Sequence, residues 1–389
     1  MHFDLTPELR EFQRSARHFV DQELVPHELT VDEHEALPKD VLARIHEKAC
    51  DYGLWPMNVP KDMGGLGSSV MEQVVAQEQA GRATNGLWAH IGGPYNALTR
   101  GTEAQRKKYL EPGLRGEWPV AYAVTEPGAG SDTTNLKTAA KRKPGSSDRW
   151  LINGEKWFVS GGHEGVGVLV HTVTGPDEET LFFVDHGTPG MRLVRTPRFM
   201  HRQEDRHPEF AFEDCEVGEE QILGGIGMAN NISKSWFREE RLHISARCLG
   251  AAQRLLDEAK VWCAERESFG SKLHEHQGIG WMLADSATEL YAARLMVYKT
   301  AWEEDQGEVD EKELHTKASM CKLYASEMVG RVADRAVQIF GGRGYCADYA
   351  AERLYRDVRV DRIWEGTSEI MRSVIVNGVM KRDLARLLG

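Results

Sequence analysis

The spacing of apolar residues changes twice along this chain, and the changes divide it into three segments. Over residues 1–118 the spacing is helical, with Thr6 suited to cap a first helix and Pro7 suited to its first position. The apolar residues that follow recur at helical intervals: Leu9, Phe12, Ala16 and Phe19. We therefore expect an N-terminal α-helical domain over residues 1–118.

Over residues 119–225 the apolar period shortens, which predicts strands. The runs 150–152, 166–170 and 181–184 are rich in β-branched and aromatic residues. Asn153-Gly154 follows the first run, and this dipeptide favours a type I′ hairpin turn because both central positions of that turn need a positive φ. The pattern predicts a β domain with a hairpin at residues 153–154.

Helical spacing returns over residues 226–389. One long helix is marked by Ile279, Leu283, Leu290, Ala293, Val297 and Ala301. A second is marked by Cys321, Ala325, Met328, Val332, Ala336 and Ile339, and Gly341-Gly342 predicts its end. Long helices in succession indicate an antiparallel bundle. Because 389 residues exceed the roughly 250–300 that one core usually holds, we expect the three segments to be separate domains.

The composition argues against several classes of protein. The formal net charge is −12, whereas a chain whose main partner is nucleic acid needs clustered Lys and Arg. Six cysteines occur without the spacing of a zinc site, so we expect reduced thiols and no metal. No apolar run reaches the roughly 18–20 residues that span a bilayer. The start of the chain resembles neither a secretory signal nor a transit peptide, so we expect a cytoplasmic protein without a membrane partner.

Residues 122–132 have the composition of a ligand-binding loop. Their glycines allow backbone N–H groups to approach a flat or phosphorylated ligand closely, and Thr125 and Ser131 offer hydroxyls. An ordinary loop between two strands is the alternative.

Glu365 is a candidate base. It precedes Gly366 and an apolar helical run, which places it on a loop just before a helix. The neighbouring Ile363 and Trp364 favour an apolar pocket, which would raise the pKa of the carboxylate toward neutrality. Taken from the residues alone, a solvated or helix-capping glutamate is the simpler interpretation.

Three charged or polar segments have simple structural interpretations. Residues 238–241 have the pattern of an exposed helix face, and residues 201–207 that of a solvated loop. Residues 266–270 suit a helix end followed by a turn. No Gly-x-Gly-x-x-Gly motif follows a strand and no P-loop occurs, so a Rossmann-type domain is disfavoured.

Six motifs, taken in order, resemble those of the acyl-CoA dehydrogenase family over essentially the whole chain. They are Gly101-Thr102-Glu103 with Gln105 and Tyr109-Leu110, Tyr122 to Asp132, Ile152 to Gly162, Arg266 with Phe269-Gly270 and Gln277, Gln338 to Tyr345, and Trp364 to Ile370. One short motif arises easily by chance, whereas six in register do not.

The resemblance implies an α+β multi-domain fold with an N-terminal helical domain (1–118), a middle β-barrel (119–225) and a C-terminal four-helix bundle (226–389). It also implies FAD between barrel and bundle, and a homotetramer built as a dimer of dimers. One subunit would contact FAD through Tyr122, Val124, Thr125, Gly130, Ser131, Phe158, Val159, Ser160, Thr367 and Glu369. The adjacent subunit would contact it through Arg266, Phe269, Gln277, Gln338, Gly341 and Gly342.

The reaction implied by the resemblance is α,β-dehydrogenation of an acyl-CoA thioester to a trans-2-enoyl-CoA. Glu365 would take the α-proton while the β-hydrogen leaves as hydride to flavin N5, with electron-transferring flavoprotein as the later acceptor. The thioester carbonyl would be bound by the backbone N–H of the base and a flavin ribityl hydroxyl. Contacts to the acyl-CoA are carried over to Ser131, Arg238, Arg241 and Gly366.

Glu240 is a second candidate base. Two family members place the base on the bundle helix immediately before the arginine that corresponds to Arg241, and this chain has Glu240 there. We favour Glu365 because enzymes that use the helix position generally have glycine in the loop.

Other functions of the same fold remain as alternatives. Phe158 and Ser160 stand where tryptophan and threonine are usual, which bears on flavin tuning and not on flavin binding. An acyl-CoA oxidase is the main alternative, although the chain length favours a dehydrogenase. A DNA-associated flavoprotein is disfavoured by the acidic charge. Trp364 beside the base favours a short or branched acyl chain.

Overall fold

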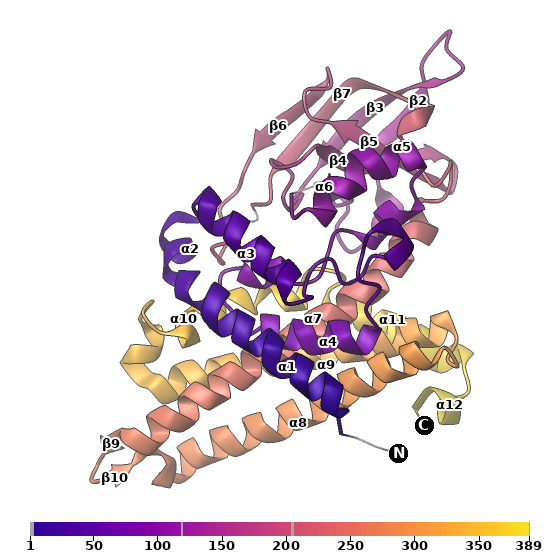
Figure 1. The fold of residues 1–389 in the computed structure, drawn as a ribbon. Coiled ribbons are helices and arrows are strands. Elements are labelled where there is room, and N and C mark those ends of the chain that lie inside the picture. Colours follow the sequence, from indigo (N-terminus) through magenta and orange to yellow (C-terminus); the bar gives the residue numbers. More distant parts are fainter. Residues whose placement is uncertain (1–3, 118–119, 204–205, 389) are drawn as a thin grey trace.

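The computed structural model describes residues 4–117, 120–203 and 206–388. The expected boundary between the first two domains, at residues 118 and 119, lies outside these ranges. Figure 1 shows a sheet above a long helical bundle, with the N-terminal helices packed along one side of both. No helix among the described residues is long and apolar enough to cross a membrane.

The N-terminal part is helical, as the apolar spacing predicts. Its first helix, α1 (Pro7–Phe19), begins where expected, because the Thr6 side chain accepts a hydrogen bond from the Leu9 N–H. Phe19, Leu24 and Ile45 are fully buried in its core. The other helices are α2 (Glu28–His34), α3 (Lys39–Asp51), α4 (Val70–Ala80), α5 (Glu103–Gln105) and α6 (Glu111–Leu114), with the short helical turn η4 (Leu87–His90) between α4 and α5.

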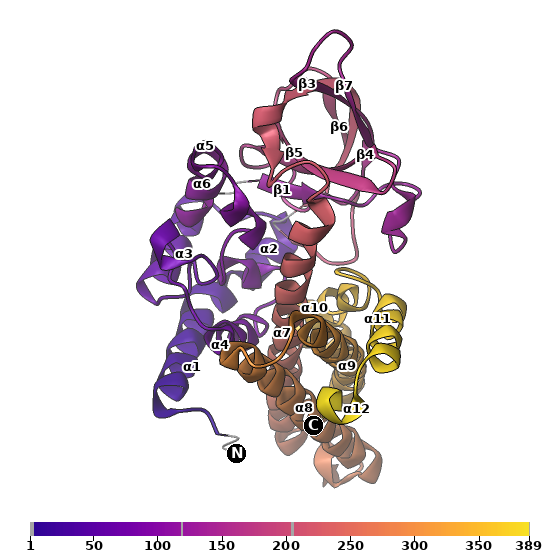
Figure 2. The same ribbon diagram turned by 90° about the vertical axis from the view of Figure 1, so that its right-hand side faces the viewer.

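The middle part is a curled sheet. Within the described residues, eight strands form it in the order β6-β7-β3-β2-β4-β5-β8, with β1 beside β4. Figure 2 shows the sheet bent round on itself over a core that includes Trp150, Ile152 and Phe182. The strands are β1 (Val120–Ala123), β2 (Ala139–Arg142), β3 (Arg149–Lys156), β4 (Gly167–Gly175), β5 (Glu178–Asp185), β6 (Met191–Arg195), β7 (Glu209–Gly218) and β8 (Ile222–Leu223).

The hairpin predicted at Asn153-Gly154 is wrong, because β3 runs straight through both residues. The pairing of β3 with β7 shifts register between Ile152 and Gly154, which marks a β-bulge. Asn153 exchanges two hydrogen bonds with Asp214 on β7, at 3.0 and 2.9 Å. Gly154 has φ 146°, and a Cβ there would lie 2.5 Å from Thr138 Oγ1. The dipeptide therefore forms a β-bulge and allows Thr138 to pack closely against Gly154; it does not form a turn.

The C-terminal part is a helical bundle, and its two predicted long helices are confirmed. In α8 (Gln277–Gln306) the residues Leu290, Val297 and Ala301 are buried. The next helix, α9 (Glu311–Phe340), ends at Gly341, whose φ is 62°. The remaining elements are α7 (Ala229–Glu265), β9 (Glu267–Ser268), β10 (Ser271–Lys272), the turn η9 (Leu273–Glu275), the turn η10 (Gly341–Tyr345), α10 (Ala350–Asp357), the turn η11 (Val360–Arg362), α11 (Ser368–Lys381) and α12 (Leu384–Leu388).

Two glycines allow α4 and α7 to pack backbone against backbone. A Cβ on Gly250 would lie 1.8 Å from the carbonyl oxygen of Glu78, and one on Gly81 would lie 2.1 Å from that of Arg247. A buried carboxylate, Glu28 on α2, also ties the N-terminal helices to the bundle, because it accepts hydrogen bonds from Arg254 on α7 at 3.0 Å and from Arg353 on α10 at 2.9 Å. The N-terminal helices and the bundle thus form one packed unit that fixes α4 relative to α7.

Candidate active site

The loop that follows β1 is anchored at its base and open at its tip. Lys156 Nζ donates to the Val124 carbonyl at 2.9 Å and to the Glu126 carboxylate at 2.8 Å, and both charged side chains are buried. Burial favours a raised pKa for Glu126, but Lys156 outweighs it and the pKa is lowered. At the tip, a Cβ on Gly128 or Gly130 would meet nothing within 4 Å. The loop therefore presents exposed backbone on a rigid base.

A second loop lies against the first. The Trp157 N–H donates to the Thr125 carbonyl at 2.8 Å. Phe158, the next residue, has φ 57° and an exposed fraction of 46%. Val159 is buried, and Ser160 Oγ lies 2.8 Å from His207 Nδ1. A hydroxyl and an exposed aromatic ring thus stand beside the glycine-rich loop.

Tyr122 joins this part of the barrel to the bundle. Its hydroxyl lies 2.8 Å from Ser233 Oγ on α7 and 2.9 Å from His171 Nδ1 on β4. Burial raises the pKa of Tyr122, and the charge of Glu365 raises it further. Glu365 therefore lies within electrostatic reach of β1. Figure 2 shows the start of α7 meeting the barrel beside β1.

Glu365 lies on a constrained loop before α11, as predicted. Its φ is 53°, and Gly366 has φ 98°. Arg241 Nε donates to the Glu365 carbonyl at 3.2 Å, and Lys322 Nζ donates to the Gly366 carbonyl at 2.7 Å. Thr367, not Glu365, caps α11 by accepting from the Ile370 N–H. The interpretation of Glu365 as a helix cap is therefore wrong.

The carboxylate of Glu365 is poised to exchange a proton near neutral pH. Its Oε2 is buried and has no hydrogen-bond partner within residues 4–117, 120–203 and 206–388. Burial, reinforced by the negative charge of Glu240, raises its pKa to about 7. The cations Arg241 and Lys322 only moderate this rise. An unpaired carboxylate with a pKa in this range is suited to general base catalysis.

Glu240 has the opposite environment. Its carboxylate lies 3.2 Å from the Arg247 guanidinium and 3.5 Å from His243 Nδ1. Burial acts to raise its pKa, but Arg247 and His243 outweigh burial and hold the pKa at about 2. Of the two candidate bases, only Glu365 combines an unpaired oxygen with a raised pKa.

The segment 238–241 faces the interior, so its interpretation as an exposed helix face is wrong. Glu239 accepts hydrogen bonds from Asn58 and Asn96, both at 2.8 Å. Arg241 is only 6% exposed, and Arg238 pairs with Glu304 at 3.1 Å. These partners come from distant segments, which periodicity on one helix does not reveal. The contacts of Arg238, Arg241, Ser131 and Gly366 with acyl-CoA remain predictions.

Beside Glu365 the side chains of Trp364, Trp88 and Arg247 form a wall, of which sequence reasoning placed only Trp364 beside the base. The Trp364 indole donates to Asp361 at 2.9 Å, and its ring meets Trp88 of η4 edge to face with centroids 5.9 Å apart. The Arg247 guanidinium lies 4.1 Å from the centroid of Trp88. The wall is therefore built from three segments: η4, α7 and the loop that precedes α11.

The second group of expected FAD contacts lies at the other end of the bundle (Figure 1). Arg266 follows the last residue of α7, whereas Ser233, which contacts Tyr122, lies near its start. At 1.5 Å per residue, the helix separates these two positions by about 50 Å. Phe269 is 99% exposed. Within one subunit, this second group therefore lies far from Tyr122 and Glu365. The group also includes Gln277, Gln338, Gly341 and Gly342.

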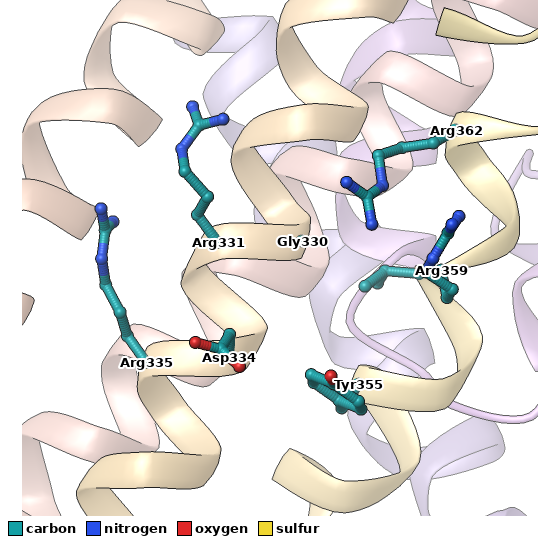
Figure 3. Close-up of a pocket in the computed structure, with 8 residues that line it drawn as sticks. Gly330, Arg331, Asp334, Arg335, Tyr355, Arg359 and Arg362 are labelled. Atoms are coloured by element: carbon teal, nitrogen blue, oxygen red, sulfur yellow. The ribbon is translucent and has the colours of Figure 1, made fainter.

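A cleft of about 420 Å³ between α9 and the α10–η11 segment is lined by four arginines: Arg331, Arg335, Arg359 and Arg362 (Figure 3). Arg331 and Arg335 pair with Glu289, and Arg362 pairs with Glu327. Much of its positive charge is therefore neutralised within the chain, and no expected site residue lines it.

Family models and curated relatives match most of this chain. Family models described as acyl-CoA dehydrogenase N-terminal, middle and C-terminal domain match residues 6–117, 121–215 and 221–380. The acryloyl-CoA reductase (NADH) of Anaerotignum propionicum is 34% identical over 390 residues, covering 98% of this chain and 97% of its own. The caffeyl-CoA reductase–Etf complex subunit CarC of Acetobacterium woodii is 33% identical, covering 95% and 97%.

A solved structure shows the same fold. The acyl-CoA dehydrogenase of Bacillus anthracis, complexed with FAD, superimposes with a TM-score of 0.87 at 27% identity. The match covers 97% of this chain and 68% of that one.

Proposed function

Because this chain belongs to the acyl-CoA dehydrogenase family, we propose that it removes the α- and β-hydrogens of an acyl-CoA thioester to give a trans-2-enoyl-CoA. Glu365 is the base that takes the α-proton. The observation that carries this assignment is the buried, unpaired Glu365 Oε2, whose carboxyl group has its pKa raised to about 7. A thioester α-proton is too weakly acidic for a solvated glutamate, so a base with a raised pKa suits the task.

FAD is the cofactor of this family, and the residues present here fit it. The open space beside Gly128 and Gly130 allows a ligand to approach the backbone, and the exposed ring of Phe158 offers a flat apolar surface. The hydroxyls of Thr125, Ser131 and Ser160 offer hydrogen bonds. FAD, when bound, supplies the acceptor for the hydride that leaves the β-carbon.

The other charged residues hold the loop of the base in place. Arg241 and Lys322 bind the carbonyls of Glu365 and Gly366, which fixes the unusual backbone of both residues. Glu240, neutralised by Arg247, stays ionised and adds to the rise in the pKa of Glu365. Arg241 and Lys322 thus position the loop and moderate the pKa of Glu365, whereas Glu240 raises that pKa.

The acyl group that fits beside this base is short or compact. The wall of Trp364, Trp88 and Arg247 is held by hydrogen bonds from Arg247 to Gln77 and Glu240 and from Trp364 to Asp361. A long acyl chain directed at the wall would have to displace this bonded stack. We therefore propose that the wall limits chain length, so that Trp88→Ala extends turnover to longer acyl-CoAs.

A second copy of the chain completes the cofactor site. Tyr122 contacts Ser233 near the start of α7, whereas Arg266 follows its end about 50 Å away, so a second subunit has to supply one of the two groups of expected FAD contacts. An exposed stripe on one face of α8, made of Trp281, Tyr291, Leu295 and Trp302, is available for such an association. These features support the association of at least two copies, and the homotetramer built from dimers is what the family implies. The CarC relative belongs to an Etf complex, which supports electron-transferring flavoprotein as the partner here.

The opposite direction, reduction of a 2-enoyl thioester, is the second candidate function. Both curated relatives described above are named as reductases of unsaturated acyl-CoAs. The same base serves this direction, because protonated Glu365 returns the α-proton.

One experiment separates these possibilities. Acyl-CoAs and 2-enoyl-CoAs of different size are added without oxygen to the purified holoenzyme, oxidised or reduced, and the visible flavin absorption is followed. Bleaching by acyl-CoA supports dehydrogenation, and recovery of absorption with enoyl-CoA supports reduction. In a second step, the substrate-reduced enzyme is mixed with either oxygen or electron-transferring flavoprotein, and faster reoxidation by oxygen indicates the oxidase. If neither class of thioester changes the spectrum, the proposed function is wrong.

A further inference from the structure

The hydroxyl of Ser160 ends a chain of hydrogen bonds through two buried histidines. His207 Nδ1 lies 2.8 Å from Ser160 Oγ, and His207 Nε2 lies 3.0 Å from His201 Nε2. His207 is 5% exposed and His201 is 7% exposed. The expectation of a solvated loop is therefore wrong for these two residues. Buried imidazoles are tolerated when they are hydrogen-bonded, as both are here.

The backbone clamps this contact from both sides. The Val159 N–H donates to the Pro208 carbonyl at 3.0 Å, and the Gly161 N–H donates to the Arg206 carbonyl at 2.9 Å. These bonds bracket Ser160 and His207. The two bonds therefore hold the backbone of Ser160 beside that of His207, so that their side chains start from adjacent, fixed positions.

Aromatic packing ties the same pair to Phe158. Phe199 stacks on His201 with ring centroids 5.4 Å apart and meets His207 edge on at 5.1 Å. Phe158 packs against Phe199 at 5.7 Å. The exposed ring and the hydroxyl assigned to the flavin thus rest on one cluster.

Both imidazoles are neutral at physiological pH. Burial, with His201 and His163 nearby, lowers the pKa of His207 to about 3, and burial with Arg356 lowers that of His201 to about 4. Between two neutral Nε2 atoms one ring donates and the other accepts, so their tautomers are linked. In one arrangement His207 Nδ1 donates to Ser160, whose own proton then points away. In the other, Nδ1 accepts that proton and Ser160 presents lone pairs.

Building on the proposed function, we propose that His207, held by His201, is a positioning residue that sets the Ser160 hydroxyl as donor or acceptor toward the flavin and so tunes its reduction potential. A flavin ring nitrogen that accepts a hydrogen bond in the oxidised state becomes an N–H donor when reduction protonates it, so the two arrangements of Ser160 would suit the two redox states. Ser160 is the group that touches the cofactor, and His207 acts through it.

The test is a double-mutant cycle on the flavin midpoint potential of the holoenzyme. His207→Ala and Ser160→Ala should each change the ratio of oxidised to reduced enzyme at a fixed potential by about tenfold, or about 30 mV for a two-electron couple. The double variant should shift no further than Ser160→Ala alone, because His207 acts only through the Ser160 hydroxyl. His34→Ala is the control, since His34 is 67% exposed and should leave the potential unchanged.

Conservative replacements sharpen the test. The side-chain amide of His207→Asn takes the place of Nδ1 and should keep a potential close to wild type, whereas His207→Gln places its amide near Nε2 and should shift it. Additive shifts, or equal potentials for the Asn and Gln variants, would overturn the proposal. If His207→Ala does not fold, the Asn and Gln pair decides alone. If the wild-type protein binds no FAD, or if thioesters do not change the absorption of its flavin, the proposed function is wrong instead.

Discussion

The carboxylate of Glu240 lies 3.2 Å from the Arg247 guanidinium, and this ion pair separates the two candidate bases. It holds the pKa of Glu240 at about 2, far below the range in which a carboxylate accepts a thioester α-proton efficiently. Glu365, whose Oε2 has no such partner among the described residues, has a pKa of about 7. The charges around the two glutamates therefore favour Glu365 over Glu240 as the base.

Replacing the base should abolish chemistry without removing the cofactor. Glu365→Gln should bind FAD normally and lower the rate of flavin reduction by about 100- to 10,000-fold, the range for loss of a general base. Glu240→Gln should change that rate by less than about tenfold, because Glu240 acts only through its field. Single-turnover flavin reduction measures both. A dead Glu240→Gln enzyme beside an active Glu365→Gln enzyme would reverse the assignment.

The rate of flavin reduction should follow the ionisation of Glu365. Only the carboxylate accepts a proton, so the rate should rise as pH passes through about 7 and level off above it. In Glu240→Gln the negative charge that raises the pKa of Glu365 is lost while Arg247 remains, so the rising limb should move to lower pH. A limb at the same pH in both enzymes would show that the two carboxylates are not coupled.

The same raised pKa predicts a stability gain in Glu365→Gln. Because the pKa is about 7 in the folded protein and 4.5 for an ordinary glutamate, the carboxyl group stabilises the fold below about pH 4.5 relative to higher pH, and this contribution is lost as pH rises through 7. At 1.36 kcal/mol per pKa unit, glutamine should gain at most about 3 kcal/mol at pH 8 and almost nothing at pH 4.5. Urea unfolding followed by tryptophan fluorescence measures the gap. If the difference in unfolding free energy between Glu365→Gln and wild type does not grow with pH, the raised pKa of Glu365 is contradicted.

The glycine contact between α4 and α7 should be sensitive to one methyl group. In Gly250→Ala the new Cβ would lie 1.8 Å from the Glu78 carbonyl oxygen, and backbone cannot move away as a flexible side chain can. The free energy of unfolding should fall by about 2 kcal/mol or more. Gly278→Ala in α8 is the matched control, because its Cβ would meet nothing within 4 Å and alanine favours helix by up to about 1 kcal/mol. Equal stabilities for the two variants would contradict the close packing.

Local features were predictable from the sequence where neighbouring residues decide them. Thr6 and Pro7 determine the start of α1, Gly341 ends α9, and Glu365 precedes a helix, all within a few residues of chain. Asn153-Gly154 misled because its conformation depends on Asp214 and Thr138, which lie on other strands or loops. A short dipeptide signal yields to such tertiary contacts.

The environment of the base was less predictable, because it is assembled from distant segments. Arg247 meets Glu240 on its own helix but also Gln77 and Trp88 from the N-terminal part. His207 looks like part of a charged loop, and only the pairing of its segment with residues 159–161 buries it. The resemblance to a family identified Glu365 as the candidate base, whereas the raised pKa of Glu365 could be derived only from the folded structure.

A shared cofactor site predicts that two inactive variants restore activity when they assemble together. Glu365→Gln removes the base but leaves Arg266 intact, and Arg266→Gln does the reverse. In a mixed dimer one site combines the intact Glu365 of one subunit with the intact Arg266 of the other, so flavin reduction should return in a fraction of sites. Co-expression with two different tags, purification over both, and titration of reducible flavin measure that fraction. Pairing Glu365→Gln with Glu365→Ala is the control, because no arrangement restores a base. Full FAD binding and activity in Arg266→Gln alone would instead show that each chain completes its own site.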